Sequence, residues 1–151
     1  MTSPLVVQIK RLDLSLPLPA YAYPGDAGLD LMATEDKTIE PLERVFIPTG
    51  IQLAIPEGYA GFVLPRSGLA ARTGLSIVNA PGLIDSHFRG EVVVIAINLD
   101  KTTPIEIKRG DRIAQLVILP TPVVTLEEVN ELNQTVRNEK GFGSSGVGKE
   151  S

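Results

Sequence analysis

The 151-residue sequence contains no cysteine and a single histidine, His87. Without cysteine, the chain has no disulfide, no thiolate nucleophile and no zinc site with sulfur ligands. His87 lies next to Asp85 and Ser86, but neighbours in one loop seldom face each other as a Ser-His-Asp triad requires. We therefore interpret His87 as a solvated loop residue.

The chain also lacks an excess of positive charge, with 14 Lys and Arg against 18 Asp and Glu and a formal net charge of −4. A nucleic-acid surface normally carries a basic patch, so we expect no nucleic-acid partner. If the ligand is an anion, its charge has to be met locally by a few arginines, by backbone amides or by a metal ion.

Long apolar segments are missing as well. No run approaches about 18 apolar residues, and Met1 to Lys10 lacks the apolar centre of a signal peptide. We expect no membrane partner, and a cytoplasmic location follows as the default.

What the sequence does contain is 14 glycines and 12 prolines, spread along most of its length. Between them lie short apolar runs with a period near two, which predict strands. The predicted strands are Val6–Ile9, Val45–Ile47, Ile51–Ile55, Gly61–Leu64, Ile77–Asn79, Glu91–Leu99, Ile105–Ile107, Ile113–Leu119 and Val123–Val129. The pattern predicts an all-β single domain, a sandwich or jelly roll. One short helix is predicted over Ser67–Thr73, with Ser67 as its cap.

The run Glu91–Leu99 is apolar on both faces instead of alternating. A strand buried on both sides needs more cover than one small sandwich provides. We therefore expect an oligomer in which a neighbouring subunit covers the second face.

The C-terminal segment from Asn138 is rich in glycine, and its only apolar residues are Phe142 and Val147. It is either a frayed terminus or a flexible arm that closes over a ligand. We predict a β domain over residues 1–136 and a flexible C-terminal arm over residues 137–151.

Polar clusters interrupt the apolar framework at four places. Each cluster can be interpreted in two ways: as an ordinary turn or structural residue, or as part of a functional site. Asp26 and Asp30 flank small residues, and Arg66 with Ser67 leads into the helical turn, where amides and a guanidinium suit a phosphate. Asp85 is either a general base or a buried structural carboxylate. Gln115 shares a strand face with apolar residues and needs a polar partner.

Taken in order, these clusters resemble the five motifs of the trimeric dUTPase family. The motifs are Asp26–Leu31, Pro65–Ala70, Gly82–Asp85 with Phe88–Gly90, Arg109–Gln115, and Arg137 with Gly141–Gly146. The resemblance implies a jelly-roll homotrimer with three active sites, each assembled from all three subunits. The implied activity is Mg²⁺-dependent hydrolysis of dUTP to dUMP and pyrophosphate, which limits uracil incorporation into DNA and supplies dUMP for dTMP synthesis.

The same resemblance implies a role for each candidate residue. Asp85 and Gln115 are the expected catalytic residues, and Asp30 acts on Mg²⁺ only through water or orients other site residues. The expected substrate-binding residues are Asn79, Leu83 and Ile84 at uracil, Asp85 and Phe88 at deoxyribose, Arg66, Ser67, Gly68 and Arg137 at the phosphates, and Phe142 stacked over the base.

The sequence departs from the family pattern at Phe88, where tyrosine is usual, and at Asn138 and Lys140, where glycines are usual. Phe88 keeps the ring that packs on deoxyribose and loses the hydrogen bond of a phenol. Asn138 and Lys140 are expected to stiffen or slow the closure of the arm.

Two other functions are compatible with this fold. A dCTP deaminase, from a related family, needs a glutamate on the strand after the hairpin, and Val94–Asn98 contains no acid. A module that binds nucleotide without turnover is expected to lack Asp85, Gln115 or Phe142, and all three are present.

Overall fold

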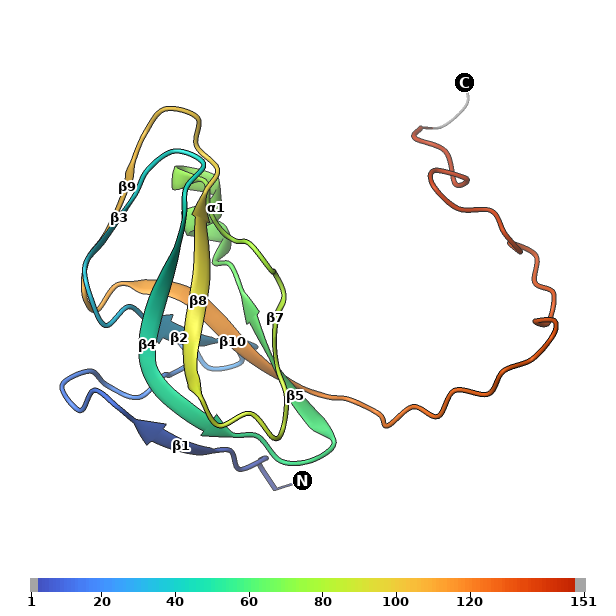
Figure 1. Ribbon diagram of the computed structural model, residues 1–151, viewed down its shortest axis with the longest axis horizontal. Coiled ribbons are helices and arrows are strands. Elements are labelled where there is room, and N and C mark those ends of the chain that lie inside the picture. Colours follow the sequence, from blue (N-terminus) through green and yellow to red (C-terminus); the bar gives the residue numbers. More distant parts are fainter. Residues whose placement is uncertain (1–2, 149–151) are drawn as a thin grey trace.

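The computed structural model describes residues 3–148, which form ten strands and one short helix (Figure 1). One four-stranded sheet has the order β1(Gln8–Arg11), β4(Arg44–Ala54), β8(Glu91–Asn98), β6(Leu75–Ile77). The second has the order β2(Leu29–Met32), β10(Arg112–Pro120), β5(Tyr59–Leu64), β7(Gly82–Ile84). A two-stranded ribbon joins β3(Lys37–Ile39) to β9(Ile105–Ile107). The predicted all-β fold is confirmed.

The core lies between the two large sheets, because each contributes one apolar face to a single buried cluster. On β8, Val92, Val94 and Ala96 point inward and are at most 3% exposed. On β10 of the other sheet, Ile113, Ala114 and Leu116 join the same cluster. Two sheets that share one apolar core make a sandwich.

The outward face of β8 is also apolar, as the sequence predicted. Ile95 and Ile97 on this face are half-buried, and Val93 is exposed. Phe46 on the neighbouring strand β4 is 65% exposed. This face therefore presents apolar side chains to solvent in the single chain.

Several predicted elements differ from the observed ones. The runs Val45–Ile47 and Ile51–Ile55 belong to one strand, β4, whose pairing with β8 shifts register between Pro48 and Gln52. The predicted strand Val123–Val129 is wrong, because these residues have no strand partner and their apolar side chains are exposed. Strands β2, β3 and β7 are not among the predicted runs, and β6 spans Leu75–Ile77 instead of the predicted Ile77–Asn79.

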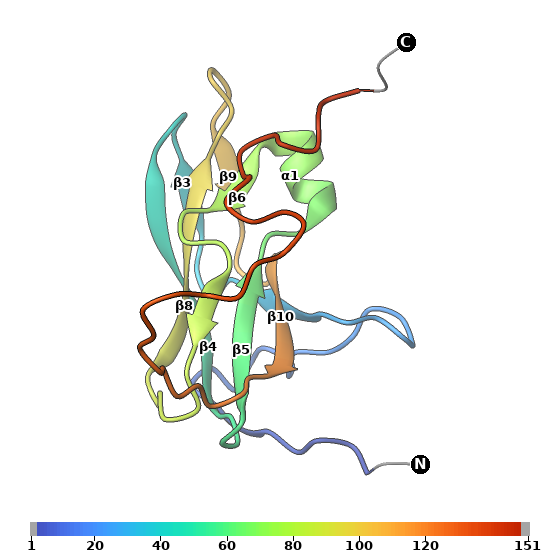
Figure 2. The same cartoon turned by 90° about the vertical axis from the view of Figure 1, so that its right-hand side faces the viewer.

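The helix α1 spans Ser67–Thr73, as predicted, and lies at one end of the sandwich (Figure 2). The prediction that Ser67 caps it is wrong: the N-cap residue is Arg66, with no side-chain hydrogen bond to the helix. None of its residues is buried, although Leu69 packs partly against the core. Among residues 3–148, no helix has the length and hydropathy needed to cross a membrane.

The last strand ends at Pro120, and the following segment runs away from the sandwich (Figure 1). All residues from Pro122 to Gly148 are exposed. Regular structure therefore ends at Pro120, before residue 136, where the predicted β domain ends. The division into a β domain over residues 1–136 and a flexible arm over residues 137–151 stays a prediction.

Asn98, at the end of β8, is fully buried and ties three segments together. Its Nδ2 donates to the carbonyls of Ile39 and Thr103, both at 2.9 Å, and its Oδ1 accepts from the Asp100 amide at 2.8 Å. A buried amide with all these bonds made is a structural clamp.

We expect Asn98→Leu to lower the free energy of unfolding by about 3 kcal/mol, because two buried carbonyls and one amide lose their partner. Urea unfolding at fixed protein concentration measures this change. Asn98→Asp serves as the comparison, since a carboxylate still accepts from Asp100 but donates to neither carbonyl. A loss for Asn98→Leu below about 1 kcal/mol would show that water or relaxation satisfies these groups.

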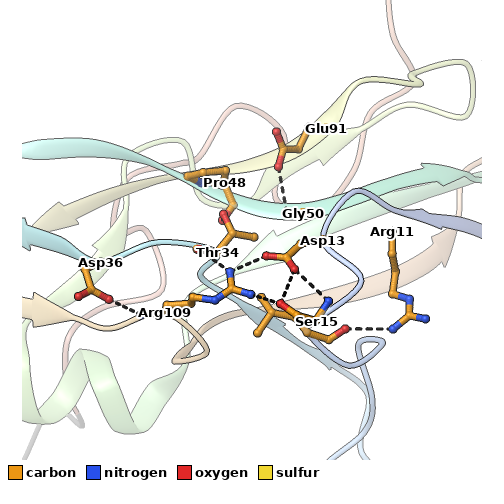
Figure 3. A network of polar contacts seen from close by, with 10 residues as sticks. Arg11, Asp13, Ser15, Thr34, Asp36, Pro48, Gly50, Glu91 and Arg109 are labelled. Atoms are coloured by element: carbon orange, nitrogen blue, oxygen red, sulfur yellow. Dashed lines mark hydrogen bonds and ion pairs between the residues drawn. The ribbon is translucent and has the colours of Figure 1, made fainter.

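Arg109 links the N-terminal segment to the turn before β10 (Figure 3). Its guanidinium pairs with Asp13 at 2.5 Å, donates to the Thr34 carbonyl at 2.7 Å and also donates to the Ser15 hydroxyl. Its backbone amide donates to Asp36 at 2.8 Å. Arg109 therefore ties the N-terminal segment and residues 34 and 36 to the turn before β10, while its side chain stays partly exposed.

This network makes stability depend on pH. The hydrogen bond from Arg109, assisted by Ser15, holds the pKa of Asp13 well below its usual range, and the Arg109 amide lowers the pKa of Asp36. A carboxyl with a depressed folded-state pKa stabilises the protein above the unfolded pKa of about 4 and loses that contribution as the pH falls further.

We therefore expect the Tm to fall steeply below about pH 4, and Arg109→Met to flatten that dependence while lowering the neutral-pH Tm by a few degrees. Thermal unfolding followed from neutral to acidic pH tests this, with Lys101→Met as the control for loss of one exposed positive charge. Parallel curves for wild type and Arg109→Met would contradict the linkage.

Candidate active site

Asp30 on β2 is the centre of the first group of predicted site residues. It is only 8% exposed, and its two carboxylate oxygens face two guanidiniums. Arg66 Nε lies 3.4 Å from Oδ1, and Arg112 Nη1 lies 3.6 Å from Oδ2. Arg66 also donates from Nη1 to the Arg112 carbonyl at 2.8 Å. A buried carboxylate between two arginines fixes their positions and leaves the group with a net positive charge.

Gln115 joins this group through strand register, because it pairs with Asp30 of β2 on one side and with Leu64 of β5 on the other. Its Nε2 donates to the Pro65 carbonyl at 2.9 Å, which is the polar partner that the sequence required. Gly28 permits this arrangement, since a Cβ there would lie 2.6 Å from Gln115 Oε1. Gln115 lines the same hollow as Asp30 and Arg66.

Ser67 and Gly68 begin the helix beside Arg66. The first backbone bond of the helix is donated by Ala70 to the Arg66 carbonyl at 3.0 Å, so the amides of residues 67–69 precede the helical ladder. A Cβ at Gly68 would meet nothing within 4 Å, so this corner is open. Free amides beside a guanidinium suit a phosphate.

The second group lies on the hairpin that includes β7. Asn79, Gly82, Leu83, Ile84, Asp85 and Phe88 all line one cavity of about 270 Å³, with Phe46 and β8 forming another wall. Gly82 packs against β5 and Asn79: a Cβ there would lie 3.4 Å from Val63 Cβ and 3.5 Å from Asn79 Nδ2, which are ordinary contact distances. An apolar cavity with a few polar groups on its rim suits a base.

Asp85 follows the last residue of β7 directly. Its side chain is exposed at the rim of the cavity, so the alternative of a buried structural carboxylate is wrong. Phe88, three residues further on, is 45% exposed on the same rim. Both side chains are open to a ligand.

Within one chain the two groups lie far apart. Ile84 pairs with Gly61 near the start of β5, whereas Arg66 follows the end of β5. At about 3.3 Å per residue, Asp85 and Arg66 are separated by roughly 20 Å along this strand. The chain therefore holds two half-sites that one copy does not bring together.

The C-terminal candidates lie near neither group. Arg137 donates from Nε to the Lys140 carbonyl at 2.8 Å, and the Phe142 ring is fully exposed. Asn138 has a φ of 46°, in the left-handed region that asparagine tolerates, and exchanges hydrogen bonds with Thr135. Asn138 thus adopts a conformation that a glycine at this position would also allow.

Among residues 3–148, no three acidic or histidine side chains come together as a metal site. Both oxygens of Asp30 already face arginines, so direct coordination of a metal by either oxygen would compete with an ion pair. These donors fit a Mg²⁺ ion held mainly by substrate phosphates and contacted through water.

Arg112 was not singled out from the sequence, although it shares Asp30 with Arg66. Arg112 begins β10 and pairs with Met32 at the end of β2. Only the strand register shows that this position lies beside Asp30.

Known proteins resemble this chain over nearly its whole length. It is 58% identical over 146 residues to the deoxyuridine 5'-triphosphate nucleotidohydrolase of Corynebacterium glutamicum, covering 97% of this chain and 98% of that protein. The Rhodococcus erythropolis enzyme of the same name is 54% identical over 146 residues, covering 97% and 89%.

Solved structures agree with the sequence relatives. A variant of the Staphylococcus bacteriophage 80alpha dUTPase with dUpNHpp superposes with a TM-score of 0.86 at 32% identity, covering 94% of this chain and 99% of that chain. A variant of the phage phi11 dUTPase, which coordinates a structural Mg(II) ion, gives 0.79 at 27% identity, covering 86% and 100%. Since the sequence model of the dUTPase family also matches residues 15–146, the chain belongs to the dUTPase family.

Proposed function

We propose that the chain hydrolyses dUTP to dUMP and pyrophosphate by attack of water on the α-phosphorus, with Asp85 as the general base. Hydrolysis of dUTP follows from the family, because the relatives that are 58% and 54% identical are deoxyuridine 5'-triphosphate nucleotidohydrolases. The observation that carries the proposed mechanism is the exposed Asp85 carboxylate at the rim of the hairpin cavity.

The hairpin cavity binds uracil in this proposal. The Asn79 side chain and the backbone groups of Leu83 and Ile84 offer donors and acceptors at its edge, and the apolar walls cover the base. A donor and acceptor pattern that fits uracil leaves the amino group of cytosine without a partner, which selects against dCTP. Strand β7 lies at the edge of its sheet, so one side of its backbone has no strand partner among the described residues.

The deoxyribose lies against Phe88 and Asp85. The Phe88 ring packs on the sugar face and leaves little room for a 2′-hydroxyl, while Asp85 accepts a hydrogen bond from the 3′-hydroxyl. The phenol of a tyrosine is not needed for this contact, since the exclusion is steric.

Arg66, Ser67 and Gly68 bind the phosphates through a guanidinium and free amides, and Gln115 helps to place the attacking water. Asp30 acts indirectly, because its ion pairs with Arg66 and Arg112 orient the two guanidiniums. When bound, Mg²⁺ would be held mainly by the substrate phosphates, with Asp30 reaching it only through water, and it would supply neutralisation of charge on the leaving group. This local arrangement lets a protein of net charge −4 bind a polyanion.

In the chemical step, the Asp85 carboxylate takes a proton from water as the water oxygen bonds to the α-phosphorus. The bond from this phosphorus to the bridging oxygen breaks, and pyrophosphate leaves. A carboxylate is a weak base, so orientation and charge neutralisation supply most of the rate enhancement.

The active form in this proposal is a homotrimer in which different copies supply the two half-sites. The separation of Asp85 from Arg66 by roughly 20 Å along β5 supports this, because one nucleotide cannot meet both in one chain. The apolar outward face of β8 with Phe46 supplies a surface for a second copy. The exposed segment after Pro120 allows the arm of a further copy to reach the site, where Phe142 stacks over uracil and Arg137 binds the terminal phosphate.

A pyrophosphate-release assay that compares dUTP, dTTP, dCTP and UTP tests the proposal. We expect dUTP to be preferred by about a hundredfold or more in kcat/KM over each competitor, because each carries one group that the site rejects. Ammonia release from dCTP would instead indicate a deaminase. Equal turnover of all four nucleotides would contradict the assignments of Asn79, Phe88 and the hairpin.

A further inference from the structure

The six residues between β7 and β8 form a compact loop, residues 85–90, that carries both Asp85 and Phe88. The Phe88 amide donates to the Asp85 carbonyl at 3.1 Å, which closes the loop into a turn. The Phe88 ring lies over Gly90, where a Cβ would be 2.6 Å from Phe88 Cζ. The direction of the Asp85 carboxylate therefore depends on the conformation of this turn.

The guanidinium of Arg89 folds back onto the same turn. Its Nη1 donates to the Ser86 carbonyl at 2.6 Å and to the Phe88 carbonyl at 2.9 Å. Hydrogen bonds from a charged donor are stronger than neutral ones, and a guanidinium holds its donors in one plane. One side chain thus fixes the peptide groups that follow Ser86 and Phe88, on both sides of His87.

The other nitrogen-bearing side chain of the loop, His87, has a different environment. His87 Nε2 lies 3.4 Å from Glu57 Oε1 at a surface where both side chains are more than three-quarters exposed. His87 points away from the turn carbonyls, so Arg89 alone provides the internal clamp among the described residues of this loop.

We propose that Arg89 is a positioning residue, whose guanidinium holds loop 85–90 in the conformation that aims the Asp85 carboxylate at the attacking water. The Phe88 ring is held against the sugar by the same clamp. Arg89 lines neither the hairpin cavity nor the hollow around Asp30, Arg66 and Gln115. Its effect on catalysis therefore passes through Asp85 and Phe88. This assignment rests on the proposed role of Asp85 as the general base.

The assignment predicts a split between kcat and KM. Asn79 and β7, which hold uracil, precede the clamped turn, so Arg89→Ala should leave KM for dUTP within about threefold of wild type. Displacing a catalytic group by about 1 Å costs up to about a hundredfold, so kcat should fall by about ten- to a hundredfold. Discrimination against UTP should weaken as well, because the Phe88 ring loses its fixed position.

The test uses the full-length protein with Arg89→Ala, Arg89→Lys and the control Lys101→Ala, which also removes one exposed positive charge. We expect Lys101→Ala to match wild type and Arg89→Lys to be intermediate, because an ammonium replaces the planar guanidinium. Millimolar guanidinium ion should restore part of the kcat of Arg89→Ala without raising its Tm.

Two results would overturn the assignment: an Arg89→Ala kcat within twofold of wild type, or a fall in kcat matched by loss of the folded oligomer in both Arg89 variants and not rescued by guanidinium. Asp85→Asn is measured beside them. If Asp85→Asn is inactive while Arg89→Ala is normal, the clamp is wrong and the general base stands. If Asp85→Asn keeps wild-type turnover, the proposed base itself is wrong.

Discussion

Replacing Asp85 with asparagine should lower kcat by about a thousandfold or more, since an amide cannot take a proton from water at neutral pH. Binding should survive, because asparagine keeps the size and hydrogen-bonding reach of the side chain. Removing one negative charge beside a triphosphate also does not weaken its attraction to the site. The expected variant is therefore a protein that holds dUTP and hardly cleaves it.

Two measurements establish this result: pyrophosphate release from dUTP, and calorimetric titration with the uncleaved analogue dUpNHpp. Glu106→Gln is the control, because Glu106 is an exposed acid on β9 whose side chain only accepts from Thr38. Near-normal turnover of Asp85→Asn would remove the general-base assignment. Loss of analogue binding together with turnover would show that Asp85 acts mainly in binding the sugar.

Ending the chain after Lys140 removes Phe142 and the glycine-rich segment, and should lower the rate by about a hundredfold or more. In the proposed function, closure of the arm excludes competing water and holds the nucleotide in a reactive geometry, and truncation should remove both effects. The proposed trimer should persist, because every residue from Pro122 to Gly148 is exposed and the sandwich ends at Pro120.

A chain that ends at Gly146 is the matched control, since it keeps Phe142 and the whole segment that matches the family. We expect this control to keep wild-type activity, and Phe142→Ala to fall between it and the shorter chain. Mass determination in solution should give the same oligomer for all of them. A monomer after truncation at Lys140 would mean that the arm is structural instead of a cover for the site.

The sandwich could be predicted from the sequence because its strands alternate and its turns carry glycine and proline. The apolar outward face of β8 was also visible, because Val93, Ile95 and Ile97 alternate with an inward apolar set. The predicted strand Val123–Val129 failed for a physical reason: a strand needs a hydrogen-bonding partner, and apolar alternation does not show whether one exists.

The candidate residues could be named from the sequence, but their contacts could not. Asp30 contacts Arg66 and Arg112 because β2 pairs with β10. This pairing joins segments far apart in the sequence, so no local sequence pattern reveals it. The sequence left open whether Asp85 is buried, because its neighbours are apolar. In the structure Ile84 points inward and Asp85 lies beyond the end of the strand, exposed. The roles of Arg89 and Arg109 likewise come from backbone carbonyls and acids brought near by folding.

The position of water attack is the most direct test of the account. When dUTP is hydrolysed in ¹⁸O-labelled water, attack on the α-phosphorus puts the label in dUMP and leaves pyrophosphate unlabelled. Mass spectrometry of the two products decides between the possibilities after a single turnover. Label in dUMP is the predicted result, and label in pyrophosphate would contradict an Asp85-activated water at the α-phosphate.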